Sequence, residues 1–321
     1  PSGRLLLWCG AAHRGGTAEM AASPGLRLNA MTPGDLEGSI IGPVLHHVDR
    51  ERIDAFVEAT GDHPERWTNN APPAYAAALL FSVAGVLLND ERIRPHLATL
   101  IHVDQQFTFH GPIEKGATIE MTGTVERVRE RGGAFFVTFV ATGTSNGEVV
   151  LDSRSTFLMS DQAAAESATE RPEPSADDRA PNEEAPGRHS LDIDRAITAR
   201  KSASRADLVR YAAATRDFNP LHWDHETARA AGLGGVVVHG LLILSWLAQQ
   251  ASAFGAGPAP IAMIKVRFRS ALAPAEAAQI ETSVTKIAPD GQDASLSLKV
   301  VANNVDVVTG SAVVNLAGVT R

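Results

Sequence analysis

Residues 74–88 read AYAAALLFSVAGVLL, and residues 241–253 read LLILSWLAQQASA. Both runs are long enough for a helix and are apolar on almost every side, so each predicts a helix that the rest of the chain must enclose. About 20 apolar residues are needed to cross a bilayer, and both runs are shorter. We therefore expect two buried central helices and no membrane partner.

The sequence around the two runs repeats. An amphipathic helix precedes each run, and Ile53 of the first corresponds to Leu208 of the second at an offset of 155 residues. The same offset relates Asp62 to Asp217, which follow these helices. The repetition predicts two copies of one folding unit. The apolar positions of the two helices are Ile53, Phe56, Val57 and Thr60, then Leu208, Tyr211, Ala212 and Thr215.

Alternating segments follow each central run and predict antiparallel strands, with Phe107 corresponding to Phe268 at an offset of 161. A curved antiparallel sheet is the element available to enclose an apolar helix. The predicted fold class is α+β, a double hot-dog in which two antiparallel sheets each wrap a buried central helix and join edge to edge as a pseudo-dimer. Two independent α+β domains are the alternative. The predicted strands are 103–110, 118–130, 134–144 and 149–159, then 264–269, 279–287, 294–302 and 305–316.

A segment without large apolar residues separates the two copies. Residues 161–190 contain no Val, Ile, Leu, Met, Phe, Trp or Tyr and are rich in Pro, Ala and acidic residues. Such a segment cannot bury enough surface to fold, so it predicts a disordered linker. The predicted organisation is a disordered leader without an export signal (1–40), a first hot-dog (41–160), the linker (161–190) and a second hot-dog (191–321).

The composition excludes some classes of partner. The 321 residues include 29 Lys plus Arg against 37 Asp plus Glu, a formal net charge of −8, which argues against binding to nucleic acid. Cys9 is the one cysteine, so the chain can form neither an internal disulfide nor a cysteine-based metal site. These features fit a protein of the reducing cytoplasm.

The second copy carries DFNPLH at residues 217–222 and GGVVVHG at residues 234–240. Asn219 and Pro220 are explained by a turn that ends a helix. Asp217 and His222 lie five residues apart across that turn, where a carboxylate and an imidazole can converge on one small molecule. Such a pair can orient and deprotonate a water, as general acid–base catalysis requires. A purely structural histidine is the alternative.

These motifs resemble the hydratase motif of the MaoC-like (R)-specific enoyl-CoA hydratases and dehydratases, over residues 195–316. APPAY at 71–75 and HVDQQFTFHGPI at 102–113 resemble the MaoC-type dehydratase N-terminal domain of fused proteins. The resemblance implies a hydro-lyase that adds water to a trans-2-enoyl-CoA to give the (R)-3-hydroxyacyl-CoA, or catalyses the reverse dehydration. It implies that Asp217 and His222 hold the catalytic water and that Asn219 fixes the loop or the water.

The enolate that forms during this reaction needs donors aimed at the thioester oxygen. Backbone N–H groups near His239, Gly240 and Leu241 begin the second central helix, are free of intrahelical partners and lie at the positive end of its dipole. We therefore predict that these three residues form the oxyanion and substrate-binding site. Arg216 departs from the family, which usually has Gly there, so a positive φ at this position would strain the loop.

Lys265, Arg267 and Arg269 share one face of a predicted strand. They are candidates for contact with the phosphates of coenzyme A, and a solvated face is the alternative. The sequence shows no Gly-rich phosphate loop and no histidines at metal-ligand spacing. We therefore expect no metal and no cofactor beyond the coenzyme A of the substrate.

The first copy lacks the motif histidine. Aligning residues 60–67 with 215–223 leaves Asp62 alone, and twelve residues of covering segment before the central helix are also missing. The first copy is therefore predicted to be catalytically silent and to shape an acyl tunnel, with Pro72, Tyr75 and the Ala-rich central helix (74–88) facing the acyl chain.

Three functional alternatives stay open. They are a 3-hydroxyacyl dehydratase acting on a carrier-protein thioester, a thioesterase on the same fold, and a non-catalytic acyl-thioester binding module. The expected partner is an acyl-CoA or acyl-carrier-protein substrate. The sequence also leaves open a homodimer of two such pseudo-dimers.

Overall fold

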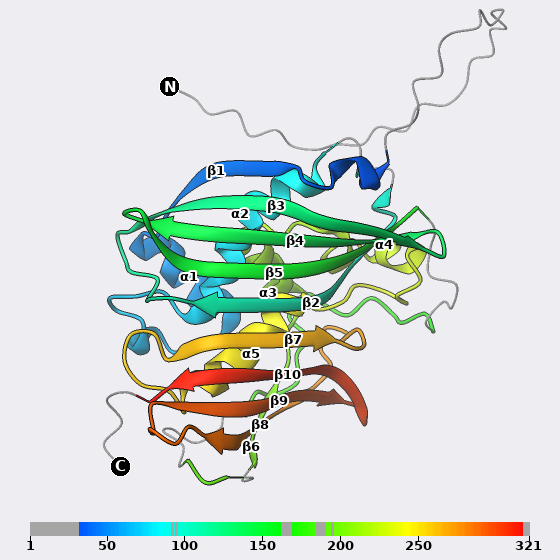
Figure 1. Cartoon of the computed structure of the whole chain (residues 1–321). Helices are drawn as coiled ribbons and strands as arrows, with labels where there is room; N and C mark the ends of the chain where they lie inside the picture. The colour runs from blue at the N-terminus through cyan, green and yellow to red at the C-terminus, as the bar shows by residue number, and fades with distance from the viewer. Residues whose placement is uncertain are drawn as a thin grey trace, which may run out of the picture. The chain divides into compact units, whose positions relative to one another are not determined.

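Antiparallel strands from both copies form one sheet in the computed structural model, which describes residues 32–316 except 91–92, 94–95, 162–168, 184–190 and 194–195. Among these residues the sheet has ten strands, in the order β1-β3-β4-β5-β2-β7-β10-β9-β8-β6 (Figure 1). The strands are β1 (Ile40–His47), β2 (Thr99–Phe109), β3 (Thr118–Arg131), β4 (Ala134–Ser145), β5 (Glu148–Ser160), β6 (Ala196–Lys201), β7 (Ile261–Phe268), β8 (Ala278–Ile287), β9 (Asp293–Ala302) and β10 (Val305–Asn315).

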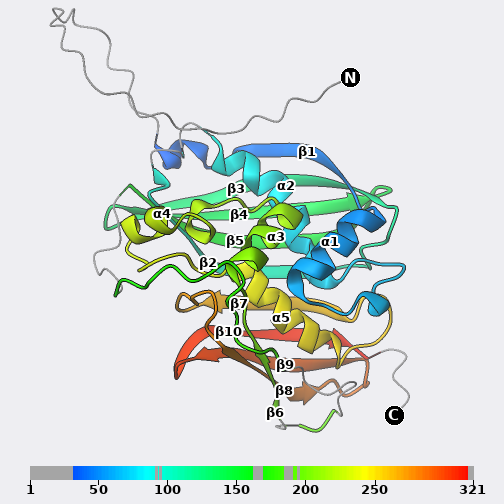
Figure 2. The same cartoon turned by 180° about the vertical axis from the view of Figure 1, so that it is seen from behind.

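The helices lie on one face of this sheet (Figure 2). Asp49 caps α1 by accepting a hydrogen bond from the backbone N–H of Arg52, and Ser204 and Asp207 form a reciprocal capping box at the start of α3. The apolar positions predicted for α1 and α3 are all buried. The α-helices are α1 (Arg50–Thr60), α2 (Ala76–Leu88), α3 (Arg205–Thr215), α4 (His225–Ala230) and α5 (Gly240–Ser252).

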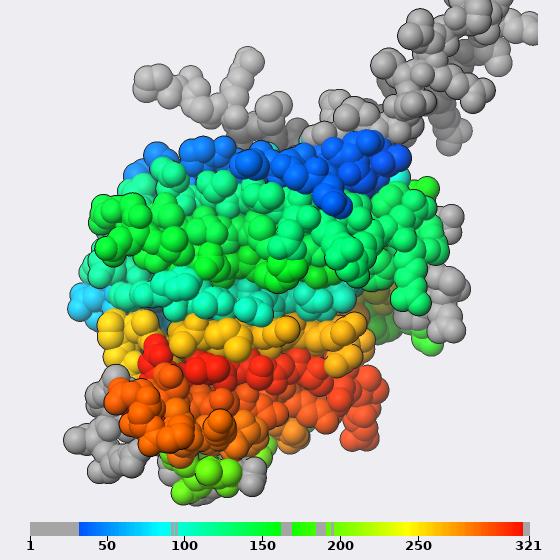
Figure 3. Space-filling view, viewed as in Figure 1, coloured from blue at the N-terminus to red at the C-terminus, as the bar shows by residue number. Residues whose placement is uncertain are grey.

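Strands β2 and β7 join the two halves. In their antiparallel register Phe107 lies opposite Ile264, and Gln105 lies opposite Val266. Gln105 and Val266 are equivalent under the offset of 161 residues, so the pseudo-two-fold axis of the duplication passes between them. The outer face of the sheet continues across this junction without a break (Figure 3). The predicted edge-to-edge pseudo-dimer is confirmed, and two independent domains are excluded.

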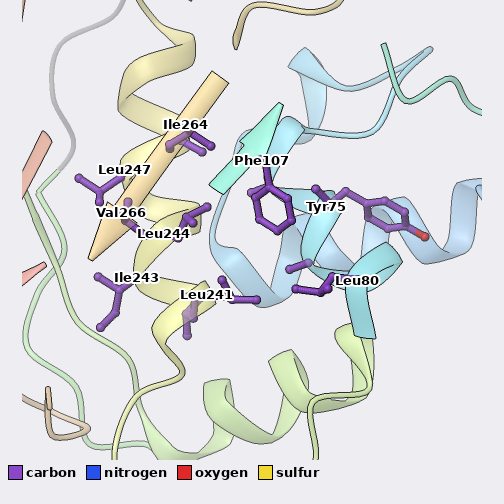
Figure 4. Close-up of a cluster of buried hydrophobic side chains, with 14 of the residues drawn as sticks. Tyr75, Leu80, Phe107, Leu241, Ile243, Leu244, Leu247, Ile264 and Val266 are labelled. Carbon is purple, nitrogen blue, oxygen red and sulfur yellow. The ribbon is translucent and has the colours of Figure 1, made fainter. Parts of the chain in front are cut away.

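A single core lies beneath the junction. Side chains of α2, α5, β2 and β7 gather there, with Phe107 beside Leu80 and with Leu244 near Ile264 (Figure 4). Both central helices are therefore enclosed, as their all-apolar surfaces require. Within the described residues, no helix combines the length and the apolar character needed to span a membrane.

Some ordered segments differ from the sequence-based expectation. Strands β1 and β6, the first strand of each copy, were not predicted. Residues 1–31 of the expected leader lie outside the described residues, but Pro33–Leu36 form a 3-10 helix, η1, whose Leu36 is buried. The leader prediction is therefore wrong near its end, because a buried leucine ties this segment to the core.

The described part of the predicted disordered linker also makes specific contacts. The backbone N–H of Arg171 donates to the carbonyl of Gly234 at 2.8 Å, and its guanidinium donates to the carbonyl of Leu233 at 3.0 Å. Glu183 and Arg200 exchange two backbone hydrogen bonds. Residues 169–183 thus bind to the second half through hydrogen bonds of the backbone and of charged side chains. The pattern of apolar residues does not predict contacts of this kind.

The two helix ends that precede Asp62 and Asp217 differ in backbone strain. Gly61 ends α1 with φ = 62°, and Arg216 ends α3 with φ = 66°, in the left-handed region that favours glycine. We expect Arg216→Gly to raise the free energy of unfolding by up to about 1 kcal/mol, as measured by urea denaturation. Gly61→Ala is the matched control and should lower the free energy of unfolding. A Cβ at this position would meet nothing within 4 Å, so the loss would come only from the backbone conformation at positive φ. Equal losses for both variants would contradict the strain at Arg216.

Candidate active site

A tight loop after α3 brings the two motif residues together. The side-chain oxygen of Asn219 accepts a hydrogen bond from the backbone N–H of Leu221, and Pro220 begins the 3-10 helix η5 (Pro220–His222). The Asn219 amide also donates to the carbonyl of Leu100 on β2 at 3.4 Å. Asn219 therefore fixes the loop and ties it to the first half of the chain.

The tautomer of His222 follows from its partner. Nδ1 lies 2.8 Å from the carbonyl oxygen of Val237, and a carbonyl can only accept, so Nδ1 carries the proton. Nε2 of the neutral ring then holds a lone pair. Burial lowers the pKa of His222 to about 4, so the ring is neutral over the physiological range. His222 is thus a fixed proton acceptor.

Asp217 is only 7% exposed. Burial raises the pKa of its carboxyl from 3.8 to about 7, and the hydrogen bond from the backbone N–H of Asn219 opposes this shift in part. A carboxyl that titrates near neutral pH can both accept and release a proton during turnover. The opposite shifts of Asp217 and His222 come from the same cause, the removal of both groups from water.

The side chain of His239 contacts both members of this pair. Its ring is fully buried and stacks on the ring of His222, with centroids 3.8 Å apart, and its Nε2 donates to the backbone carbonyl of Asp217 at 3.2 Å. Burial holds the pKa of His239 well below its ordinary value. The sequence predicts His239 among the substrate-binding residues, but its side chain does not line the cavity described below.

The fold brings three potential metal ligands together, although the sequence showed no metal-ligand spacing. Donor atoms of Asp217, His222 and His239 all lie within 4.8 Å of one another. The two rings are stacked with an interplanar angle of 26°, so their in-plane lone pairs run side by side, whereas the ligands of one ion must converge. This geometry favours acid–base chemistry over a shared ion.

Asp217 and His222 open onto a cavity of about 230 Å³. Gly240 and Leu241, the first residues of α5, line it. The N–H groups of Leu242 and Ile243 both donate to the carbonyl of His239. Within the described chain, the N–H groups of Gly240 and Leu241 have no backbone acceptor, as is usual in the first turn of a helix. The start of α5 therefore offers two donors to an oxygen in the cavity.

The first half supplies one wall of this cavity, in part from the predicted Ala-rich helix, α2, which contributes Phe81 and Leu88. Tyr75 is 1% exposed and its hydroxyl lies 2.8 Å from Nε2 of His46, and neither it nor Pro72 lines the cavity. The tunnel role predicted for Pro72 and Tyr75 is therefore wrong for this cavity, and the hydroxyl of Tyr75 is held by His46 instead. The lining residues of the first half are Phe81, Leu88, Leu100, Ile101, His102 and Phe157.

The three candidate phosphate-binding cations do not stay together. Lys265 and Arg267 are exposed and alternate with the buried Val266, so they lie on the outer face of the sheet, away from the cavity. Their predicted contact with coenzyme A is not supported by this placement. Arg269 follows the end of β7, and of the three cations it alone lines the cavity.

The equivalent place in the first half is chemically different. The carboxylate of Asp62 accepts hydrogen bonds from the indole N–H of Trp67 at 3.0 Å and from the backbone N–H of His63 at 2.8 Å. Both residues line a cavity of about 520 Å³ with Trp246 of α5, and the His63 side chain is 48% exposed. Asp62 is thus held by an indole where Asp217 faces an imidazole.

Both halves of the chain match family models. Residues 181–307 match the MaoC like domain, and residues 36–153 match the FAS1-like dehydratase domain region. A UPF0336 protein of Streptomyces coelicolor is 27% identical over 100 residues, which cover 27% of this chain and 67% of that protein. A mitochondrial 3-hydroxyacyl-[acyl-carrier-protein] dehydratase of Arabidopsis thaliana is 39% identical over 67 residues, 21% of this chain and 40% of that protein.

Solved structures share the fold. A MaoC-like dehydratase superposes with a TM-score of 0.72 and 20% identity, covering 88% of this chain and 98% of that one. A Mycobacterium tuberculosis protein described as having a double hotdog fold gives 0.62 and 12% identity, covering 87% and 96%. These comparisons confirm the predicted double hot-dog.

The buried carboxylate should cost the protein stability. Because the folded-state pKa of Asp217 is raised, its favourable contribution is complete below the ordinary value of 3.8 and is lost as the pH rises to about 7. We expect Asp217→Asn to be more stable than the wild type at pH 8 by on the order of a few kcal/mol, with the gain shrinking towards pH 4. Thermal unfolding at several pH values checks this, and a gain that does not depend on pH would contradict it.

Proposed function

Because the chain combines a MaoC-like domain with a FAS1-like dehydratase region in a double hot-dog, we propose that it is a hydro-lyase that interconverts a trans-2-enoyl thioester and the (R)-3-hydroxyacyl thioester. One observation carries the proposal. Asp217 and the proton-accepting Nε2 of His222 flank a cavity at whose wall the N-terminus of α5 offers N–H groups without backbone acceptors. Acid–base groups and an oxyanion site are the two elements that such a reaction requires.

In the proposed hydration, one water donates its hydrogens to the Asp217 carboxylate and to Nε2 of His222. These two hydrogen bonds aim a lone pair of the water oxygen at C3 of the enoyl group. The C3–O bond forms as a proton passes from the water to Asp217, and the C2–C3 double-bond electrons move to the thioester oxygen as an enolate. The proton on Asp217 then bonds to C2. Since water and carboxyl lie on one side of the substrate, the addition is syn, and dehydration reverses each step.

The enolate oxygen is proposed to lie at the start of α5. The backbone N–H groups of Gly240 and Leu241 donate to it, and the positive end of the helix dipole stabilises its charge. The ring of Phe268 lies so close to Gly240 that a Cβ there would come within 2.9 Å of it. Glycine at this position thus lets the phenyl ring pack directly against the start of α5.

The handle of the thioester is proposed to be coenzyme A, with Arg269 as the cation nearest the cavity. A carrier-protein thioester is the second candidate, which the similarity to the Arabidopsis carrier-protein dehydratase favours. With Cys9 as its one cysteine, the protein is proposed to act in a reducing compartment such as the cytoplasm.

The wild type should consume crotonyl-CoA, measured by the loss of enoyl-thioester absorbance, and chiral analysis should find the (R)-3-hydroxy product. We expect Asp217→Asn and His222→Ala each to lower kcat by at least about 100-fold, because each removes one of the two groups that hold and deprotonate the water. Asp62→Asn is the matched control and should keep full activity, because Trp67 already holds that carboxylate.

Two results would contradict this scheme. Release of free thiol from the thioester, without loss of the enoyl double bond, would indicate a thioesterase. No turnover of CoA thioesters or carrier-linked thioesters of any chain length would indicate a binding module.

The pH dependence of kcat/KM should report Asp217. Both directions begin with its carboxylate form, so kcat/KM should fall on the acid side of a midpoint near pH 7 with unit slope and level off above it. His222 titrates at about 4 and leaves the range from 5.5 to 9 to Asp217 alone. A steady-state profile over that range is the measurement, and a flat profile would exclude Asp217 as the base.

A further inference from the structure

The proposed hydratase site leaves one polar side chain of its cavity without a role. His102, on β2 of the first half, lines the cavity beside Asp217 and His222. Its Nε2 is buried and has no hydrogen-bond partner among the described residues. A buried polar atom left unpaired costs free energy and calls for a ligand, a water or a functional reason.

The ring of His102 is held by aromatic contacts. Its centroid lies 4.7 Å from that of Phe157 and 5.2 Å from that of Phe268. Phe268 is also the ring that covers Gly240 at the start of α5. His102 and the place proposed for the thioester oxygen therefore both border the ring of Phe268 in one cavity.

A β-bulge turns His102 towards the cavity. Gln105 and Phe107 on β2 face the core, so regular alternation would place His102 on the outer face of the sheet. The register of β2 against β5 shifts between His102 and Asp104, and this extra residue reverses the alternation. Bulges recur beside active sites because they re-aim a side chain in this way.

The second half shows that the fold itself does not require this arrangement. The counterpart of His102 at the offset of 161 residues is Met263 on β7. Met263 pairs with Thr108 and alternates regularly with the buried Ile264, so it lies on the outer face. The register shift of β7 falls between Ile261 and Met263 instead. At this position of the repeat, a side chain thus faces the cavity on β2 of the first half but not on β7 of the second half.

We infer that His102 hydrogen-bonds the thioester unit of the substrate through Nε2, so that the active site is composite and the first half contributes a catalytic residue. This inference rests on the proposed hydratase function and amends the prediction of a silent first half. Burial keeps the imidazole neutral, with a pKa of about 4, so it contributes a hydrogen bond and no charge.

The test compares His102→Phe with His102→Gln. Phenylalanine preserves the packing between Phe157 and Phe268 and removes the polar atom, whereas glutamine keeps a side-chain donor and acceptor. We expect kcat/KM for crotonyl-CoA to fall at least about tenfold in His102→Phe and to be restored in large part in His102→Gln. Thermal unfolding should show both variants folded.

His96→Phe is the matched control. Nδ1 of His96 is also buried without a partner, and its ring packs on Phe135 at 5.0 Å, but it does not line the cavity. We expect this variant to keep wild-type kcat/KM. Wild-type kcat/KM in His102→Phe, or equal losses in His102→Phe and His96→Phe, would overturn the inference.

A binding measurement separates this inference from the proposed function. Butyryl-CoA carries the thioester but cannot be hydrated, so its Kd is measurable by calorimetry whether or not the protein is a hydratase. If the wild type turns over no thioester, the proposed function fails, and a Kd for butyryl-CoA raised about tenfold in His102→Phe but not in His96→Phe would still support the contact. An unchanged Kd in that case would reject both.

Discussion

The pairing of β2 with β7 is the constraint on which the rest of the structure depends. Each half has a central helix that is apolar on all sides, and the joined ten-stranded sheet encloses both helices over a single core. The same junction places the loop after α3 against β2, where the Asn219 amide bonds the carbonyl of Leu100. The cavity at the catalytic pair therefore exists only because the two halves are joined, and either half alone would leave it open.

Enclosure also creates the chemistry. Removal from water raises the pKa of Asp217 to about 7, where its carboxyl exchanges a proton easily, and lowers that of His222 to about 4, so the imidazole stays a neutral acceptor. Residues outside the loop hold the catalytic pair in place. The carbonyl of Val237 fixes the tautomer of His222, and the buried ring of His239 stacks on the ring of His222. Stability is given up at this site in exchange for reactivity, as is common where charged groups are buried for catalysis.

Patterns of apolar residues were enough to predict the duplication, both central helices and eight of the strands, because burial is written into side-chain type. Contacts made by the backbone leave no such pattern. The strap formed by residues 169–183 binds through carbonyls and charges, so its composition indicated disorder. The motif predicted Asp217 and His222, but the bulge that turns His102 inward depends on strand register, which alternation alone cannot reveal.

The two halves show how a duplicated site can diverge without loss of the fold. In the first half the indole of Trp67 and the backbone N–H of His63 donate to the Asp62 carboxylate, so hydrogen bonds within this half already hold that carboxylate. Its β2 and α2 nevertheless contribute to the wall of the other site. A one-residue bulge is enough to present a new polar group to the cavity while the strand pairing on both sides persists. The duplication thus separates the half that holds the acid–base pair from the half that shapes what the pair can reach.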